Sequence, residues 1–179
     1  RLAVAHAELD AHGDEGDADV SPDGSEVAYT FTPRADQNRS SEIRVASVDG
    51  GAVRKLTGTP DMHDGGPRWS PDGQTIAYAS ERSGNYELHL VGPDGAGERQ
   101  LTSAGADHSD HEWHPDGSRI AAVRCDRNRF HLVSVDPSDG TTFWAINQYY
   151  GPDINNVWNT WVSSFQALQT VSTDYYSVN

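Results

Sequence analysis

A four-residue motif that occurs three times constrains the fold of this chain more than any other feature of its sequence. It reads Ser-Pro-Asp-Gly at residues 21–24 and 70–73, and His-Pro-Asp-Gly at residues 114–117. Successive copies therefore start 49 and 44 residues apart. The other residues that recur in phase are Trp69 and Trp113, the apolar segments 27–29, 76–78 and 120–122, and the Leu-Thr pairs 56–57 and 101–102. An internal period of about 40–50 residues is typical of repeat architectures built from one supersecondary unit.

Each repeat is predicted to contain four short strands. In the second repeat these strands cover residues 67–70, 75–80, 86–91 and 98–102. The segments between them are rich in Pro, Asp, Asn and Gly, which favour tight turns. Short β-rich runs separated by such turns predict antiparallel all-β structure, and four strands per repeat are typical of a propeller blade. We therefore expect an all-β, partial β-propeller of about three four-stranded antiparallel blades within residues 17–140, at residues 17–57, 65–102 and 109–140.

These motifs resemble a known group of families. The Trp-Ser-Pro-Asp-Gly, Ile-Ala-Tyr and Leu-Thr elements resemble the WD40-like PD40 blades of TolB-like propellers. They also resemble the propeller domain of the prolyl oligopeptidase (S9) family of serine peptidases, including its acylaminoacyl-peptidase branch. In the first repeat, segments 41–45, 48–51 and 54–57 carry the resemblance to that branch. In the peptidases, the resemblance implies, the propeller gates a separate α/β-hydrolase domain that carries a Ser-Asp-His triad.

The sequence itself contains no Gly-x-Ser-x-Gly nucleophile elbow. We therefore predict no catalytic residue and no cofactor in this chain. Three blades are also fewer than the about four to eight with which propellers close, so the chain is either a fragment or part of a ring closed by association of chains. Two functions stay open. The chain is the non-catalytic propeller portion of an S9-type peptidase, or a TolB-like module without enzymatic activity that binds a protein. The expected partner is accordingly a peptide substrate or a protein.

Charge and hydropathy exclude other functions. The chain carries 27 Asp and Glu against 13 Lys and Arg, a net charge of −14. An acidic protein of this kind disfavours nucleic-acid backbones, which require Lys and Arg to neutralise phosphates. No apolar run is long enough to predict a membrane span. We expect a cytoplasmic location, or a periplasmic one if the chain is TolB-like. The single cysteine, Cys125, is expected to be a small buried hydrophobe.

Three histidines between residues 108 and 114 form the one candidate metal site. Neutral imidazole is a common metal ligand, so His108, His111 and His114 are the candidates. Side chains alternate between the two faces of an extended strand, which would place His111 opposite the other two. We therefore expect no metal here, and instead a polar strand that faces the propeller channel.

The two ends of the chain differ from the repeats. Residues 1–16 are expected to be a linker or the approach to the first blade. Residues 141–179 contain no Lys or Arg and three of the five Trp. Within them, apolar residues at spacings of three and four predict an amphipathic helix over residues 153–171. This helix is either an ordinary packed helix or a docking helix that self-associates through Trp158, Trp161 and Phe165. A third reading gives the whole tail an origin different from that of the blades.

Overall fold

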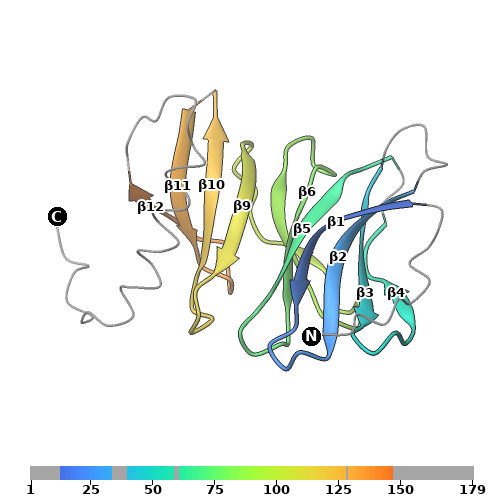
Figure 1. Cartoon of the computed structure of the whole chain (residues 1–179). Helices are drawn as coiled ribbons and strands as arrows, with labels where there is room; N and C mark the ends of the chain where they lie inside the picture. The colour runs from blue at the N-terminus through green and yellow to red at the C-terminus, as the bar shows by residue number, and fades with distance from the viewer. Residues whose placement is uncertain (1–12, 34–39, 59–60, 128, 147–179) are drawn as a thin grey trace. The chain divides into compact units, whose positions relative to one another are not determined.

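The computed structural model describes residues 13–33, 40–58, 61–127 and 129–146 (Figure 1). They form three four-stranded antiparallel sheets, each made of four consecutive strands. The first sheet contains β1 (Gly13–Val20), β2 (Glu26–Pro33), β3 (Glu42–Ser47) and β4 (Val53–Lys55). The second contains β5 (Asp64–Trp69), β6 (Ile76–Ser80), β7 (Glu87–Val91) and β8 (Arg99–Gln100). The third contains β9 (Asp107–Trp113), β10 (Ile120–Asp126), β11 (Arg129–Val135) and β12 (Thr142–Ile146). The predicted partial propeller is confirmed.

The Pro-Asp-Gly motif forms the turn between the first two strands of each sheet. In the turn after β1, the Gly24 N–H donates to the Ser21 carbonyl at 2.8 Å, and Gly24 has a φ of 74° that favours glycine. The Asp23 carboxylate accepts hydrogen bonds from the Ser21 hydroxyl at 2.6 Å and from the Ser25 N–H at 3.0 Å. These hydrogen bonds, with that from Ser21 as the largest contribution, lower the pKa of Asp23 to about 2. The motif recurs because its first residue and its Asp form hydrogen bonds within the turn, while its Gly adopts the positive φ.

The Leu-Thr pair fastens the outermost strand of a sheet to the third strand. The Thr57 hydroxyl accepts the Ile43 N–H at 2.9 Å, and the Thr102 hydroxyl accepts the Leu88 N–H at 2.9 Å. Both threonines are buried. Threonine recurs at this position because its hydroxyl satisfies a buried amide that would otherwise lack a partner. The short outer strands β4 and β8 thereby gain an anchor beyond their few ladder hydrogen bonds.

Neighbouring sheets pack face to face through equivalent positions of the repeat. Between the first and second sheets the buried residues are Ala28, Ile43, Val45, Trp69, Ile76, Tyr78 and Val91, with Leu56 beside them. Between the second and third sheets they are Ala77, Leu88, Leu90, Leu101, Trp113, Ile120, Ala122, Val133 and Val135. Each buried aliphatic side chain contributes about 1.5–3 kcal/mol, so these two layers are the main source of stability. The second sheet is covered on both faces.

A β-bulge interrupts the first strand of every sheet. The pairing register shifts between Gly16 and Asp19, between Gly65 and Arg68, and between the partners of Ser109 and Glu112. Each bulge contains one residue with positive φ, namely Asp17 at 41°, Gly66 at 63° and Asp110 at 45°. A bulge places two residues opposite one and changes which face the following side chains occupy. The inner strands therefore do not follow simple alternation.

The strands do not stop at the boundaries expected from the sequence. The first strand begins at Gly13, within the segment 1–16 that was expected to be a linker or the approach to the first blade, and β12 lies within 141–179. Both extensions follow from pairing, because Gly13 lies opposite Pro33 and Thr142 lies opposite Val135. The helix predicted over residues 153–171, with Trp158, Trp161 and Phe165, lies outside the described residues. No helix in the described part of the chain is long and apolar enough to cross a membrane.

Glycine at position 140 is required by a close backbone approach between the second and third sheets. Its φ is 77°, and a Cβ there would lie 1.9 Å from the Leu101 carbonyl oxygen. Gly84 also has a positive φ, of 91°, but a Cβ there would meet nothing within 4 Å. Both substitutions to alanine pay the cost of a left-handed conformation, about 1–2 kcal/mol. We predict that Gly140→Ala lowers the thermal midpoint by about 5 °C or more beyond Gly84→Ala. Equal midpoints in calorimetry would contradict the close approach.

Candidate functional site

His108 on β9 belongs to a buried polar cluster between the second and third sheets. Its Nδ1 lies 3.0 Å from Glu87 Oε2, and its side chain is fully buried. Glu87 also accepts the Thr102 hydroxyl at 2.5 Å and the Gly105 N–H at 3.0 Å. Burial lowers the pKa of His108 although Glu87 opposes the shift. The cluster joins β7, the segment after β8, and β9 through one carboxylate.

This cluster contains the residue types of a catalytic triad in an arrangement that does not activate a nucleophile. The Thr102 hydroxyl donates to Glu87 and accepts the Leu88 N–H, whereas His108 Nδ1 is 3.5 Å away. In a triad the imidazole takes the proton of the hydroxyl and the carboxylate orients the imidazole. Here the carboxylate holds both groups, and all three side chains are buried. The arrangement fixes the joint between the sheets.

His111 lies against the second sheet, as His108 does. Its Cε1 is 3.5 Å from the position that a Cβ on Gly66 would take, and its side chain is buried. The expected placement of His111 opposite His108 was therefore wrong. The bulge at Asp110 is the reason, because Ser109 pairs with Val123 and Glu112 pairs with Ala121, which leaves two residues of β9 opposite one of β10.

His114, the third candidate ligand, lies in the turn after β9. It occupies the position of Ser21 and Ser70 in the other turns, and its Nδ1 is 2.6 Å from Asp116 Oδ1. Within residues 13–146, gaps excepted, no three His, Cys, Asp or Glu side chains lie close enough to hold a metal ion. The three histidines therefore do not form one site: His108 and His111 are buried between the second and third sheets, and His114 lies in a turn.

Burial of His111 makes stability depend on pH. Burial lowers the pKa of His111 to about 4, against about 6.5 in an unfolded chain. The stability associated with the neutral ring is therefore complete above pH 6.5 and is lost as the pH falls towards 4, because only the unfolded chain binds a proton in that range. The loss amounts to about 3 kcal/mol. We predict that His111→Leu reduces this decline in urea unfolding between pH 7 and pH 4.

The control for this measurement is Leu88→Met, another substitution of a buried residue in the same layer. Leu88→Met changes packing without removing a titrating group, so it should lower stability at each pH and retain the parent's decline. An undiminished decline in His111→Leu would show that other groups cause the acid sensitivity.

A second polar cluster lies within the second sheet and was not predicted from the sequence. Arg82, in the turn between β6 and β7, places Nη2 3.2 Å from both carboxylate oxygens of Asp64, whose side chain is fully buried. Its Nη1 donates to Glu98, which also accepts the Tyr78 hydroxyl. Burial and the contact with Glu98 raise the pKa of Tyr78. No spacing in the sequence connects Asp64 with Arg82.

Removing Arg82 leaves the Asp64 carboxylate buried without its cation. Breaking a buried pair in this way costs about 3–5 kcal/mol, whereas an exposed pair contributes about 0–1 kcal/mol. We predict that Arg82→Gln lowers the free energy of unfolding by about 3 kcal/mol. The control is Arg68→Gln, which removes a more exposed ion pair with Glu112 and should cost less than about 1 kcal/mol. Similar losses for the two variants in urea unfolding would refute the buried pair.

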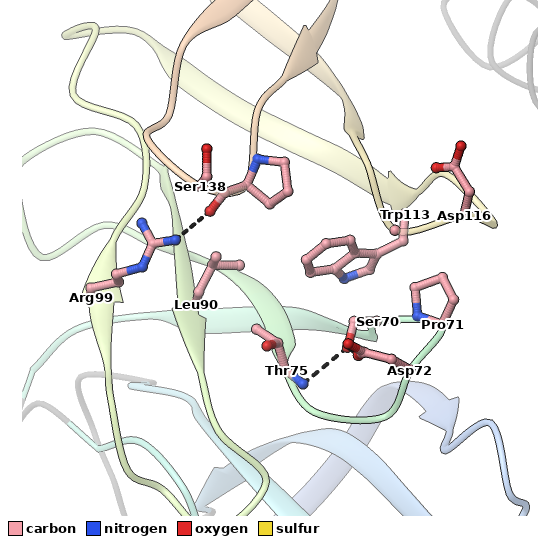
Figure 2. A pocket seen from close by; sticks show the side chains of 11 residues that line it. Ser70, Pro71, Asp72, Thr75, Leu90, Arg99, Trp113, Asp116 and Ser138 are labelled. Atoms are coloured by element: carbon pink, nitrogen blue, oxygen red, sulfur yellow. Dashed lines mark hydrogen bonds between the residues drawn. The ribbon is translucent and has the colours of Figure 1, made fainter.

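A hollow of about 540 Å³ opens between the second and third sheets, at the end where their Pro-Asp-Gly turns lie (Figure 2). Its lining residues are Ser70, Pro71, Asp72, Thr75, Leu90, Arg99, Trp113, Asp116, Gly117, Pro137 and Ser138. The Trp113 indole N–H donates to the Arg68 carbonyl at 3.1 Å, which fixes the ring in the wall. The sequence singled out Trp113 and both turns as repeat markers. It did not indicate that Arg99 lines the other end of the hollow, although Arg54 and Arg99 recur in phase with the Leu-Thr pairs.

The repeat, the blade packing and the turns match a known domain. The sequence signature of the TolB beta propeller domain (PD40) matches residues 6–145, most of the chain. The chain belongs to this TolB β-propeller family. The predicted resemblance to TolB-like and S9-type propellers is thereby confirmed.

Relatives of this TolB β-propeller chain include peptidases as well as TolB proteins. An uncharacterized peptidase, YuxL of Bacillus subtilis (strain 168), is 32% identical over 111 residues, which cover 58% of this chain and 16% of the relative. The Tol-Pal system protein TolB of Syntrophus aciditrophicus (strain SB) is 38% identical over 71 residues, or 37% of this chain and 16% of that protein. The crystal structure of puromycin hydrolase superposes with a TM-score of 0.66 and 25% identity, over 77% of this chain and 22% of that one. The chain thus spans about a sixth of the length of the two curated relatives.

Proposed function

We propose that this chain is the non-catalytic β-propeller portion of an S9-type serine peptidase, and that it restricts the access of peptides to a catalytic domain outside this sequence. The observation that carries the proposal is the extent of the peptidase match. The likeness to the Bacillus peptidase extends over 111 residues, whereas the likeness to TolB covers 71. The longer match is more than two repeat periods long, so it extends over more than two blades.

The polar clusters are consistent with a scaffold. The one His-carboxylate-hydroxyl group described above is buried at a joint between sheets and holds the sheets together. The sequence contains no nucleophile elbow. In this proposal the propeller restricts which peptides reach the active site, and the catalytic residues lie on another domain.

A TolB-like module that binds a protein partner is the second candidate. The 38% identity with the Syntrophus TolB protein, higher than that with the peptidase although over a shorter stretch, favours it. The coding sequence downstream of residue 179 separates the two proposals. A Gly-x-Ser-x-Gly elbow followed by Asp and His within a few hundred codons supports the peptidase. A stop codon or an unrelated domain there supports the binding module.

The peptidase proposal predicts that this chain alone does not hydrolyse peptide substrates. Purified residues 1–179 should show no turnover of aminoacyl p-nitroanilides above the buffer rate, because no described serine is arranged with a base and an oxyanion site. A fluorophosphonate probe should likewise leave its serines unlabelled. Turnover that survives repurification and disappears after substitution of one serine of this chain would overturn the non-catalytic assignment.

A further inference from the structure

We propose that the hollow between the second and third sheets binds an arginine side chain presented by a peptide segment of a protein partner. The volume of about 540 Å³ lies within the range of about 300–1,000 Å³ that is usual for ligand pockets. It exceeds one side chain, so it accommodates the arginine together with adjoining main chain. This proposal does not depend on whether the chain serves a peptidase or a TolB-like module.

The walls of the hollow suit the apolar part of an arginine. The Trp113 indole and the Leu90 side chain lie in the middle of the hollow, and Pro71 lies beside Trp113 (Figure 2). Arginine packs its methylene stem on apolar surface, and its planar guanidinium stacks on aromatic rings. The hydrogen bond from Trp113 to the Arg68 carbonyl holds the indole in place, so the wall is formed before a ligand binds.

Two carboxylates at one end of the hollow supply the complementary charge. Asp72 and Asp116 come from equivalent Pro-Asp-Gly turns of the second and third sheets. In Figure 2 Asp72 lies below the Trp113 indole, and Asp116 lies on the side of Trp113 away from Leu90. In these turns, Oδ1 of Asp72 accepts hydrogen bonds from Ser70 and Gln74. Oδ1 of Asp116 accepts the Ser118 N–H and lies 2.6 Å from His114 Nδ1. Among the described residues, Oδ2 of Asp72 accepts no hydrogen bond, whereas Asp116 also receives a side-chain hydrogen bond from Ser118. Oδ2 of Asp72 is therefore available to a guanidinium, and Asp116 adds a second negative charge.

Both carboxylates are ionised at neutral pH. The hydrogen bonds from Ser118 lower the pKa of Asp116 to about 2, and the hydroxyl of Ser70 lowers the pKa of Asp72. The overall charge of −14 adds a field that attracts cations to the surface. A basic occupant is thus favoured over a neutral or acidic one at this end.

Arg99 gives the hollow a direction. It lies on the side of Leu90 away from Trp113, and its Nη2 donates to the Pro137 carbonyl (Figure 2). One guanidinium therefore faces two carboxylates across an apolar middle. A bound arginine places its head at the aspartates, while its peptide carbonyls lie toward Arg99.

The test is an NMR titration of the full chain with a defined probe. The probe is the capped tripeptide acetyl-Gly-Arg-Gly-amide, and its neutral isostere contains citrulline in place of arginine. The arginine peptide should shift the Trp113 indole N–H and Leu90 methyl signals in a saturable manner. It should bind about fivefold or more tightly than the citrulline peptide, because two partly exposed ion pairs are lost with the charge. Equal affinities, or shifts confined to other parts of the chain, would overturn the proposal.

Matched variants separate this site from general attraction to an acidic surface. Asp72→Asn/Asp116→Asn should weaken binding about fivefold. Asp23→Asn/Asp49→Asn makes the same change of charge, with Asp23 in the equivalent turn of the first sheet, and should leave affinity within twofold. Equal weakening in both double variants would reject a specific site.

Arg99→Gln provides a readout that does not depend on the stability of the aspartate turns. This substitution removes the Arg99 guanidinium, which repels a bound cation, and leaves the turns of Asp72 and Asp116 unchanged. The variant should therefore retain or increase affinity for the arginine peptide. A loss of affinity in Arg99→Gln would overturn the orientation proposed here, with the melting temperature of each variant recorded to confirm folding.

Discussion

The packing of one sheet face on the next is the constraint on which the rest of this structure depends. An isolated four-stranded sheet would leave its apolar faces exposed to water, so each face must pack against another element. The repeat solves this by placing Ile43 and Val45, or Leu88 and Leu90, on one face and a tryptophan-bearing face opposite. Because the two faces differ and are complementary, each sheet presents to its successor the surface that its predecessor presented to it. The sequence is periodic because each of these head-to-tail contacts requires the same residue types at equivalent positions.

The polar groups at the joints follow from the same constraint. Strands of neighbouring sheets approach closely near the start of β5 and β9, where backbone groups must still find partners. The Asp64 N–H bonds to the Ser41 carbonyl at 3.0 Å, and the Ser41 hydroxyl returns a bond to the Asp64 carbonyl at 2.8 Å. Once the backbone is fixed there, the side chains of Asp64 and His108 are buried and require partners of their own. Arg82 and Glu87 meet that requirement, which is why charge is found inside an otherwise apolar layer.

The sequence predicted those parts of the fold that local chemistry determines. The turn residues, the strand count and the Leu-Thr anchors are each encoded within a few neighbouring positions, so their periodic recurrence was enough to predict the blades. The bulges were not predicted, because Asp17 and Asp110 are ordinary residues in a strand pattern and only Gly66 hints at positive φ. That omission misplaced His111. The pairing of Arg82 with Asp64 was also missed, since it joins a turn to a strand start through tertiary packing and leaves no spacing in the sequence.

The site differs from the fold in how it depends on the repeat. A hollow forms at this joint because the turns at residues 70–73 and 114–117 lie beside one another, and each turn contributes an aspartate to its lining. The aspartates that stabilise these two turns thus also place negative charge beside the gap between the sheets. The outer-strand Arg99 is not part of that repeated chemistry, and corresponds to Arg54 in the first sheet, which instead binds Glu26 and the Pro93 carbonyl. The first joint therefore satisfies its arginine with a carboxylate as well as a carbonyl, whereas among the described residues Arg99 at the second joint donates only to the Pro137 carbonyl. This difference between equivalent positions separates the hollow at the second joint from the joint between the first and second sheets.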